Sequence, residues 1–207
     1  MKTMLSKVRS LKKGSLRRTV DFRTAEFEKM GRSRMNGIFC ELCFCILTAN
    51  FNAERTIRIQ KEIGDGFLSL PEKKLAANLR RLGHRFPNTR AKYIVQARQH
   101  IKPLSEALRN MRGNGLREWI VKNVKGLGYK EASHFLRNVG YTDYAIIDFH
   151  IIDVLAKHGI IRRPKTLTKV KYLEIEETLR GIAKRLGLNL SELDLYLWYM
   201  ETGKVLK

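Results

Sequence analysis

The sequence is poor in cysteine, proline and acidic residues, and it contains no long apolar run. Its three cysteines, Cys40, Cys43 and Cys45, are too few and too close together for a disulfide framework, which favours a reducing compartment. Charged residues interrupt every apolar stretch before it reaches the roughly 18 residues that we take as a candidate membrane helix. The N-terminus also lacks the apolar core of a secretory signal. The sequence therefore predicts neither a secreted disulfide-rich domain nor a membrane protein.

The shortage of acids leaves a large positive charge. Lys and Arg number 41 against 20 Asp and Glu, so the 207 residues carry a formal charge of +21. Such a field concentrates polyanions, and nucleic acid, anionic membranes and acidic proteins are the partners to consider. Because 43% of the residues are hydrophobic, the chain can bury a core and is not a disordered basic tail.

The positive charge is concentrated in two regions. Residues 73–102 contain nine basic residues and no acid, and the first 35 residues contain eleven bases against three acids. A charge run is usually a solvated helix face. A stretch without acids that covers two helices nevertheless favours a surface that holds phosphates, because ordinary surfaces mix both signs.

The four prolines punctuate a helical pattern. Pro71, Pro103 and Pro164 stand where helices are expected to begin, and Pro87 is expected in a loop. Residues 35–48 are apolar on nearly every face, which is typical of a buried central helix. Further helices are expected at 52–63, 72–82, 89–101, 103–111, 115–124, 130–139, 149–158, 168–186 and 191–202, the last two capped by Thr168 and Ser191. No alternation of period two is present, so we predict an all-α protein.

Residues 119–140 carry the most specific local signal. One predicted helix ends at Val124, the sequence Gly126-Leu127-Gly128 forms a tight turn, and a second helix begins near Lys130. The turn aims free amides of the second helix at any phosphate that approaches it. This pattern is typical of a helix-hairpin-helix, although a lone Gly-x-Gly also fits an ordinary helical corner.

Two residues near this turn suggest chemistry. Lys130 lies in the first turn of a predicted helix, where the positive end of the helix dipole disfavours a cation, and that unfavourable placement argues for a use. Asp148 follows eighteen residues later among apolar neighbours. Asp is also a common N-cap, and a capping carboxylate is compatible with a catalytic one because it is ionised and held in place.

The hairpin block GLGYKEASHFLRNVG from Gly126, followed by AIIDFH from Ala145, closely resembles the second family of 8-oxoguanine DNA glycosylases of archaea and some bacteria. This family belongs to the helix-hairpin-helix superfamily of base-excision enzymes. The resemblance continues through residues 41–50, 82–86 and 191–207, so it covers nearly all of the chain beyond residue 35. It implies a two-lobed all-α fold with DNA between the lobes. The implied lobes are residues 35–144, with the hairpin at about 115–140, and residues 1–34 joined with 145–207.

The resemblance implies a bifunctional glycosylase and AP lyase that excises 8-oxoguanine during base excision repair. Lys130 matches the nucleophile, whose amine attacks C1′ of the damaged nucleotide, expels the base and forms a Schiff base that permits β-elimination of the 3′ phosphate. That attack needs a neutral amine, whereas a lysine in water is almost wholly protonated at neutral pH. Asp148 matches the carboxylate that stabilises developing positive charge at the sugar and assists proton movement.

The remaining site residues are also implied by the resemblance. A damaged base must leave the stack to reach Lys130, which requires a pocket and a wedge. Asp194, Trp198, the terminal Lys207 and either Phe44 or Cys45 are the candidates to bind the extruded base. Asn50, Arg85 and Phe86 match residues that fill the vacated duplex, and Gly126 and Gly128 match the DNA-binding turn. For the aromatic residues the alternative is a place in the core, and for Lys207 it is a frayed basic end.

We expect no metal and no iron-sulfur cluster, apart from a structural monovalent cation at the hairpin. A C-x-x-C-x-C run inside an apolar helix does not direct three sulfurs at one ion, and no cysteine follows Cys45 to complete a four-cysteine cluster. The expected partner is double-stranded DNA containing 8-oxoguanine, bound by a monomer in the prokaryotic cytoplasm at the nucleoid. Phe149 departs from the family, whose members usually carry arginine there.

Two alternatives stay open. The same scaffold could act on another oxidised base, such as an oxidised pyrimidine, or the chain could be a non-catalytic helix-hairpin-helix module that only binds DNA. Pure binding needs the glycines and the positive field but not the pair of Lys130 and Asp148.

Overall fold

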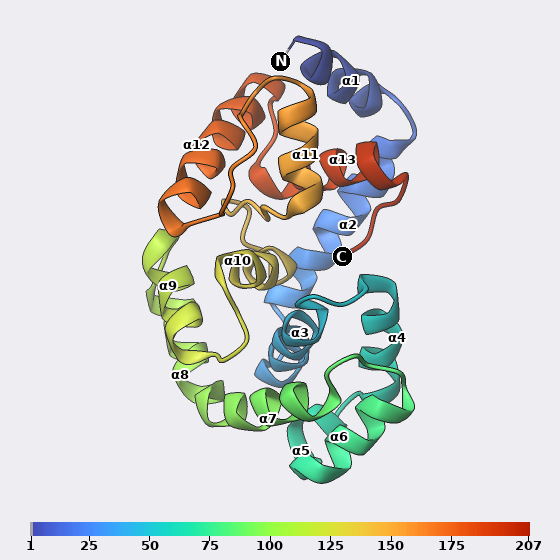
Figure 1. Ribbon diagram of the computed structural model, residues 1–207, viewed down its shortest axis with the longest axis vertical. Helices are drawn as coiled ribbons and strands as arrows, with labels where there is room; N and C mark the ends of the chain where they lie inside the picture. Colours follow the sequence, from blue (N-terminus) through green and yellow to red (C-terminus); the bar gives the residue numbers. More distant parts are fainter. Residues whose placement is uncertain (1) are drawn as a thin grey trace.

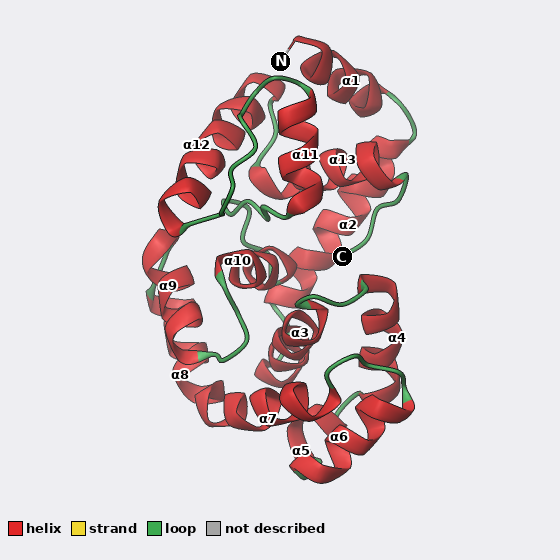
Figure 2. Cartoon of the chain, viewed as in Figure 1, coloured by secondary structure: helices red, strands yellow, loops and turns green. Residues whose placement is uncertain are grey.

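The computed structural model describes residues 2–207, and every regular element in that range is a helix (Figure 2). In chain order these are α1 (Lys2–Lys13), α2 (Leu16–Gly31), α3 (Met35–Thr48), α4 (Ala53–Ile63), α5 (Gly66–Ser69), α6 (Glu72–Arg81), α7 (Pro87–Ala97), the short 3₁₀ helix η1 (Arg98–His100), α8 (Ile101–Asn110), α9 (Gly113–Asn123), α10 (Tyr129–Asn138), α11 (Phe149–Lys157), α12 (Lys169–Leu186) and α13 (Leu190–Thr202). The predicted all-α class is confirmed.

Most predicted helix boundaries agree with the structure within two residues, but the predicted roles of two prolines and one helix cap were wrong. Pro87 is not in a loop: it is the first residue of α7, where a missing amide hydrogen costs nothing. Pro164 precedes α12 within a loop instead of opening a helix. The cap of α13 is Asn189 and not Ser191, because Asn189 accepts from the amide of Glu192 while the Glu192 carboxylate accepts from the amide of Asn189, each at 2.9 Å.

Two hydrophobic clusters organise the molecule. The first takes its residues from positions 38–144 and surrounds α3, which contacts α4, α5, α7, α8 and α10. The second takes its residues from positions 4–27 and 145–197, so it joins α1 and α2 to α11, α12 and α13. In Figure 1 helices α3 to α7 lie in the lower half of the molecule, α1 and α11 to α13 lie in the upper half, and α10, whose buried residues belong to the first cluster, lies near the middle.

Helices α1 and α2 build one wall of the second cluster. α1 packs against α12 and α13, and α2 contacts α13, α10 and α3. Gly31 at the end of α2 allows this approach, because a Cβ atom there would lie 2.3 Å from the carbonyl oxygen of Val139. The segment is therefore part of the folded core rather than a basic arm.

The C-terminal tail after α13 returns to the first cluster and ends beside α4 (Figure 1). Lys204 forms an ion pair with Glu54 at 2.6 Å, and the Lys207 ammonium lies 2.9 Å from the Glu41 carboxylate in α3. The tail thus connects the two clusters. Within residues 2–207, none of the helices combines the length and the hydropathy needed to span a bilayer.

Candidate functional site

A cavity of about 930 Å³ opens where the two clusters meet. Its walls come from the α3–α4 turn, one face of α10, the segment that leads into α11 with the first turn of that helix, the loop before α12, α13 and the C-terminal tail. Six of the predicted site residues line it: Asn50, Lys130, Asp148, Asp194, Trp198 and Lys207. Phe44, Arg85, Phe86, Gly126 and Gly128 lie outside the lining.

The hairpin turn places Lys130 at this cavity. Gly126 has a φ of +89°, and a Cβ atom there would lie 2.6 Å from a ring carbon of Tyr93, so both the backbone and the space require glycine. The turn ends at Gly128, whose amide donates to the carboxylate of Glu131 at 3.3 Å and so begins α10. Lys130 follows in the first turn of α10.

The side chain of Lys130 is 31% exposed, and its ammonium lies 3.1 Å from a carboxylate oxygen of Glu131. It therefore faces the open volume while its charge is balanced by a neighbour on the same helix. The sequence predicted its place in the helix; the contact with Glu131 is an addition from the structure.

Asp148 caps the helix on the other side of the cavity. One of its carboxylate oxygens accepts from the amide of Ile151 at 3.0 Å, so the residue is the N-cap of α11. Ile147, Ile151 and Ile152 are buried around it, which anchors the cap in the second cluster. Capping and access to the cavity occur together, as the sequence allowed.

The side chains of Trp198 and His150 form one aromatic wall. Their rings meet edge to face with centroids 5.0 Å apart. The indole Nε1 of Trp198 is buried and has no hydrogen-bond partner among the described residues. Phe149 stands at the rim of the same cavity with 75% of its surface exposed, an unusual position for a large apolar side chain.

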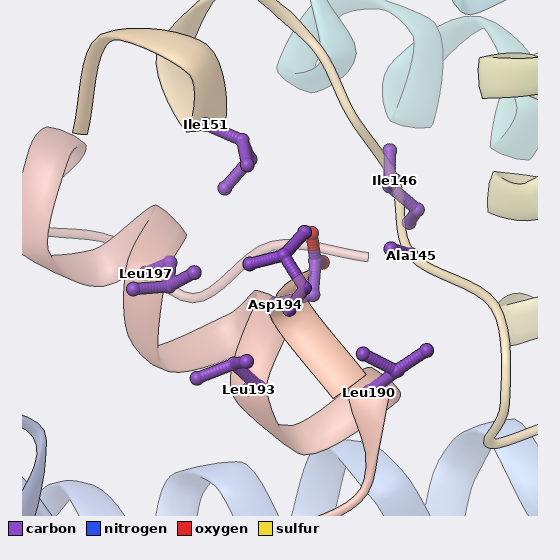
Figure 3. A pocket seen from close by; sticks show the side chains of 8 residues that line it. Ala145, Ile146, Ile151, Leu190, Leu193, Asp194 and Leu197 are labelled. Carbon is purple, nitrogen blue, oxygen red and sulfur yellow. The ribbon is translucent and has the colours of Figure 1, made fainter. Parts of the chain in front are cut away.

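Asp194 forms a buried ion pair instead of standing free in the cavity. Its carboxylate accepts from the Arg137 guanidinium at 2.5 Å. Behind it lies a void of about 10 Å³, and the other residues that line this void are apolar (Figure 3). Burial raises the pKa of Asp194 to about 6, and the nearby charge of Asp148 acts in the same direction, while Arg137 opposes both.

Lys207 and Phe44 contact each other, but only Lys207 reaches the cavity. The ammonium of Lys207 lies 4.2 Å from the ring centroid of Phe44, a cation–π geometry. Phe44 is fully buried in α3, with the His134 ring edge-on to it at 5.7 Å. The structure thus places Phe44 behind the wall of the cavity, because α3 is buried on nearly every face.

Glu41 is a residue of this region that the sequence analysis did not assign to the site. It is buried in α3 and accepts from Lys207 at 2.9 Å and from the Asn138 amide at 2.7 Å. Asn138 in turn accepts from Arg137 at 2.9 Å, so a chain of polar contacts leads from the terminal lysine to Asp194. A single carboxylate within the apolar sequence of α3 was the signal that could have identified it.

The loops that carry Asn50 and Phe86 are held together by two buried side chains. His84 bonds to the carbonyl of Leu47 at 3.0 Å through Nε2 and accepts from the amide of Phe86 at 3.0 Å through Nδ1. Arg90 donates to the carbonyl of Ala49 at 2.5 Å, next to Asn50, which has a φ of +57°. The segments that carry Asn50 and Phe86, which were predicted to fill the gap in the duplex, are therefore neighbours. The sequence analysis did not predict that His84 and Arg90 hold them together.

The basic stretch of residues 73–102 is only partly a surface. Arg90 is buried and donates to the carbonyl of Ala49. Arg98 is half-buried and donates to the carbonyls of Phe67 at 2.8 Å and Leu70 at 2.7 Å. The other basic residues of the stretch, Lys73, Lys74, Arg80, Arg81, Arg85, Lys92 and Lys102, are exposed. The prediction that the stretch as a whole holds phosphates was therefore wrong for Arg90 and Arg98.

The cysteines of α3 are free. Cys43 and Cys45 are fully buried in the first cluster, as expected of core residues, and burial raises the pKa of both thiols well above the usual value. Among the described residues, His, Cys, Asp and Glu form no cluster of three or more that could hold a metal ion.

Comparison with known proteins gives one consistent result. A sequence model of a family described as 8-oxoguanine DNA glycosylase matches residues 20–188. Proteins named 8-oxoguanine DNA glycosylase/AP lyase from Korarchaeum cryptofilum and Methanocaldococcus jannaschii are 52% and 54% identical, and the matches cover 99% of this chain and 98% and 99% of theirs.

Solved structures agree with these sequence matches. The crystal structure of the M. jannaschii 8-oxoguanine glycosylase/lyase in complex with a 15mer DNA containing 8-oxoguanine is similar with a TM-score of 0.96 at 51% identity, covering 99% of this chain and 100% of that one. The crystal structure of the 8-oxoguanine DNA glycosylase of Thermotoga maritima is similar with a TM-score of 0.93 at 43% identity, covering 100% and 99% of the two chains.

Proposed function

Because the chain belongs to the 8-oxoguanine DNA glycosylase family, we propose that its cavity excises 8-oxoguanine from double-stranded DNA and then cleaves the strand, with Lys130 as the nucleophile. The chain is an enzyme of the glycosylase and AP lyase class. The observation that supports the assignment of residues is that the amine of Lys130, the carboxylate of Asp148 and the ring of Trp198 line one cavity.

The location of Lys130 suits a nucleophile. It stands beside the hairpin turn, so a duplex held by the turn presents its backbone next to the amine. The attack on C1′ uses the lone pair of the amine, so the ion pair with Glu131 must open and a proton must leave Nζ first. The new C–N bond then replaces the bond to the base, and the Schiff base that follows permits β-elimination of the 3′ phosphate.

Asp148 supplies negative charge where the sugar becomes positive. Its carboxylate is held by the amide of Ile151, and this fixed geometry avoids the cost of orienting a free side chain during the reaction. The carboxylate also lies at the N-terminus of α11, where the helix dipole interacts favourably with negative charge. We assign Asp148 the role of stabilising the sugar cation and assisting proton transfer.

The volume between Lys130 and Trp198 suits an extruded base. Trp198 offers an aromatic side chain, and Asp194 and Lys207 place charged groups at the same wall. Base extrusion costs a few kcal/mol, and the loops that carry Asn50 and Phe86 are the candidates to fill the gap that the base leaves. The exposed lysines and arginines of residues 73–102 add salt-dependent binding of DNA phosphates. We propose that one chain suffices, because every one of these groups comes from the same monomer.

Borohydride trapping tests this assignment. Wild-type protein, Lys130→Gln and Lys125→Gln are mixed with a duplex that carries one 8-oxoguanine, and borohydride reduces any Schiff base to a stable adduct. Lys125 is an exposed lysine just before the same turn, so it controls for loss of positive charge near the DNA. We expect adducts with the wild type and with Lys125→Gln, and none with Lys130→Gln.

Two outcomes would contradict the proposal. If the wild type forms no adduct at saturating protein, the Schiff-base mechanism is wrong. If Lys130→Gln forms as much adduct as the wild type, the nucleophile lies elsewhere. A parallel duplex with an oxidised pyrimidine measures the substrate assignment separately, because faster excision from it would assign the cavity to another lesion.

A further inference from the structure

The backbone that leads into Asp148 is held by side chains of α12. Residues 144–148 form a non-helical segment between α10 and α11, and Ala145 and Ile147 are buried within it. Buried backbone groups need hydrogen-bond partners, and no strand among the described residues provides them. The amide of Ala145 donates to Glu176 at 3.0 Å, the carbonyl of Ala145 accepts from the Tyr172 hydroxyl at 2.6 Å, and the amide of Ile147 donates to the same hydroxyl at 3.2 Å.

The same two side chains of α12 are linked to the helix that carries Lys130, Tyr172 directly and Glu176 through Arg117. The Tyr172 hydroxyl lies 3.2 Å from the hydroxyl of Ser133, which is one turn after Lys130 in α10. Ser133 accepts from the guanidinium of Arg117 at 3.1 Å, and Arg117 pairs with both carboxylate oxygens of Glu176 at 2.6 and 2.9 Å. Arg117 is fully buried, so this ion pair is shielded from solvent and salt.

The network therefore has the two proposed catalytic residues at its ends. Ile147 is bonded directly to Asp148, so a shift of the Ile147 amide moves the carboxylate with it. Apolar contacts also hold α11, but such contacts are non-directional and fix position less sharply than hydrogen bonds do. The Tyr172 hydroxyl contacts both the backbone of the segment before Asp148 and a side chain of the helix that carries Lys130.

We infer that Tyr172 is a positioning residue, which sets the place of the Asp148 carboxylate relative to the Lys130 amine through its hydroxyl. This inference rests on the proposed function of the two residues. Tyr172 does not line the cavity, and its ring is buried against Tyr129 at 5.6 Å and under the Arg117 guanidinium at 5.5 Å. Its effect on the reaction is therefore indirect, by geometry alone.

The variant Tyr172→Phe isolates this role. It keeps the buried ring and its contacts with Tyr129 and Arg117, and it removes only the hydroxyl. The Ala145 carbonyl and the Ile147 amide then lose a partner, and the segment can shift toward other ones. Because misplacement by 1 Å can cost a reaction about 100-fold, we expect the single-turnover rate constant of base excision to fall by about 10-fold or more. The dissociation constant for duplex DNA should change less than about 2-fold, since Tyr172 lies away from the cavity surface.

Tyr141→Phe is the matched control. The Tyr141 hydroxyl donates to the carbonyl of Leu108 at 2.7 Å, so the control removes the same kind of hydrogen bond from a part of the first cluster that does not line the cavity. It should match the wild type in rate. The rate constant is fitted separately from the reaction amplitude, because partial unfolding lowers the amplitude and leaves the rate constant of the folded fraction unchanged.

The outcomes separate this inference from the proposed function. If Lys130→Gln abolishes excision and Tyr172→Phe retains the rate constant of the wild type and of Tyr141→Phe, the positioning role is refuted while the proposed function stands. A lower amplitude without a lower rate constant also refutes it, because Tyr172 is then structural only. If Lys130→Gln itself retains full activity, the proposed function fails and this inference fails with it.

Discussion

Replacing Asp148 in two ways separates its role as a helix cap from its proposed role in the reaction. The carboxylate accepts one hydrogen bond, from the amide of Ile151 at 3.0 Å, and it faces the cavity. Asn caps helices about as well as Asp does, because its amide oxygen accepts the same hydrogen bond. Asp148→Asn therefore keeps the cap and removes the charge, whereas Asp148→Ala removes both.

The structure sets the expected sizes of these effects. Loss of charge at the N-terminus of α11 costs about 0.3–1 kcal/mol in the free energy of unfolding, and loss of the cap costs about 0.5–2 kcal/mol in addition. For a chain of this length, 1 kcal/mol shifts Tm by about 2–4 °C. Asp148→Asn should thus melt within about 4 °C of the wild type, and Asp148→Ala should melt clearly lower. Removal of a preorganised charge from a developing cation should lower the excision rate about 100-fold or more in both variants.

Thermal unfolding and single-turnover excision from a duplex with 8-oxoguanine measure the two effects on the same samples. The duplex dissociation constant should stay near that of the wild type in Asp148→Asn. An Asp148→Asn variant that excises the base within about 3-fold of the wild-type rate would refute the catalytic role and leave Asp148 as a cap. An Asp148→Asn variant that is less stable than Asp148→Ala would refute the view that the cap is retained.

Two further predictions concern the turn and the clamp near the cavity. Gly126→Ala should lower the free energy of unfolding by roughly 1–3 kcal/mol, because the φ of +89° disfavours a side chain and the new Cβ would lie 2.6 Å from the Tyr93 ring. Gly128→Ala is its control, since its φ of −93° suits alanine, and equal losses in urea unfolding would contradict the prediction. Burial lowers the pKa of His84 below its ordinary value of 6.5, so the unfolded chain binds the proton more tightly than the folded protein does. The stability that depends on neutral His84 should be complete above about pH 7 and should decline as the pH falls below 6.5. In urea unfolding, the free energy of unfolding of His84→Gln should therefore decline less between about pH 7 and pH 5 than that of the wild type. An identical pH dependence in both proteins would contradict this role of His84.

The sequence was a good guide wherever the determining interactions are local. The all-apolar residues 35–48 form the buried helix α3, and Thr168 and Asp148 cap their helices as predicted. Caps and hydrophobic periodicity act within a few residues, so they are visible in the sequence. The predicted cap at Ser191 was wrong, because the reciprocal hydrogen bonds of Asn189 and Glu192 begin the helix two residues earlier.

Charge was the property that the sequence described least well. The pattern counted Arg90 and Arg98 with a basic surface, but both guanidinium groups are used to bind backbone carbonyls inside the first cluster. A guanidinium has several donors and a long apolar stem, so it can serve either purpose, and only the neighbouring carbonyls decide. The ion pair of Asp194 with Arg137 is likewise set by tertiary structure, and the prediction that Asp194 binds a base stays a prediction.

The sequence by itself determined that this is a basic all-α protein with a hairpin before Lys130 and a capping carboxylate at Asp148, because each of these features is encoded within a few adjacent residues. Tertiary structure alone decided how the two come to face one cavity. The buried pairs that hold them are remote in the sequence, with Arg117 and Glu176 59 residues apart and Arg137 and Asp194 57 residues apart. Residues at such separations come into contact only when burial in the two clusters brings their helices together, and local sequence patterns do not predict such contacts.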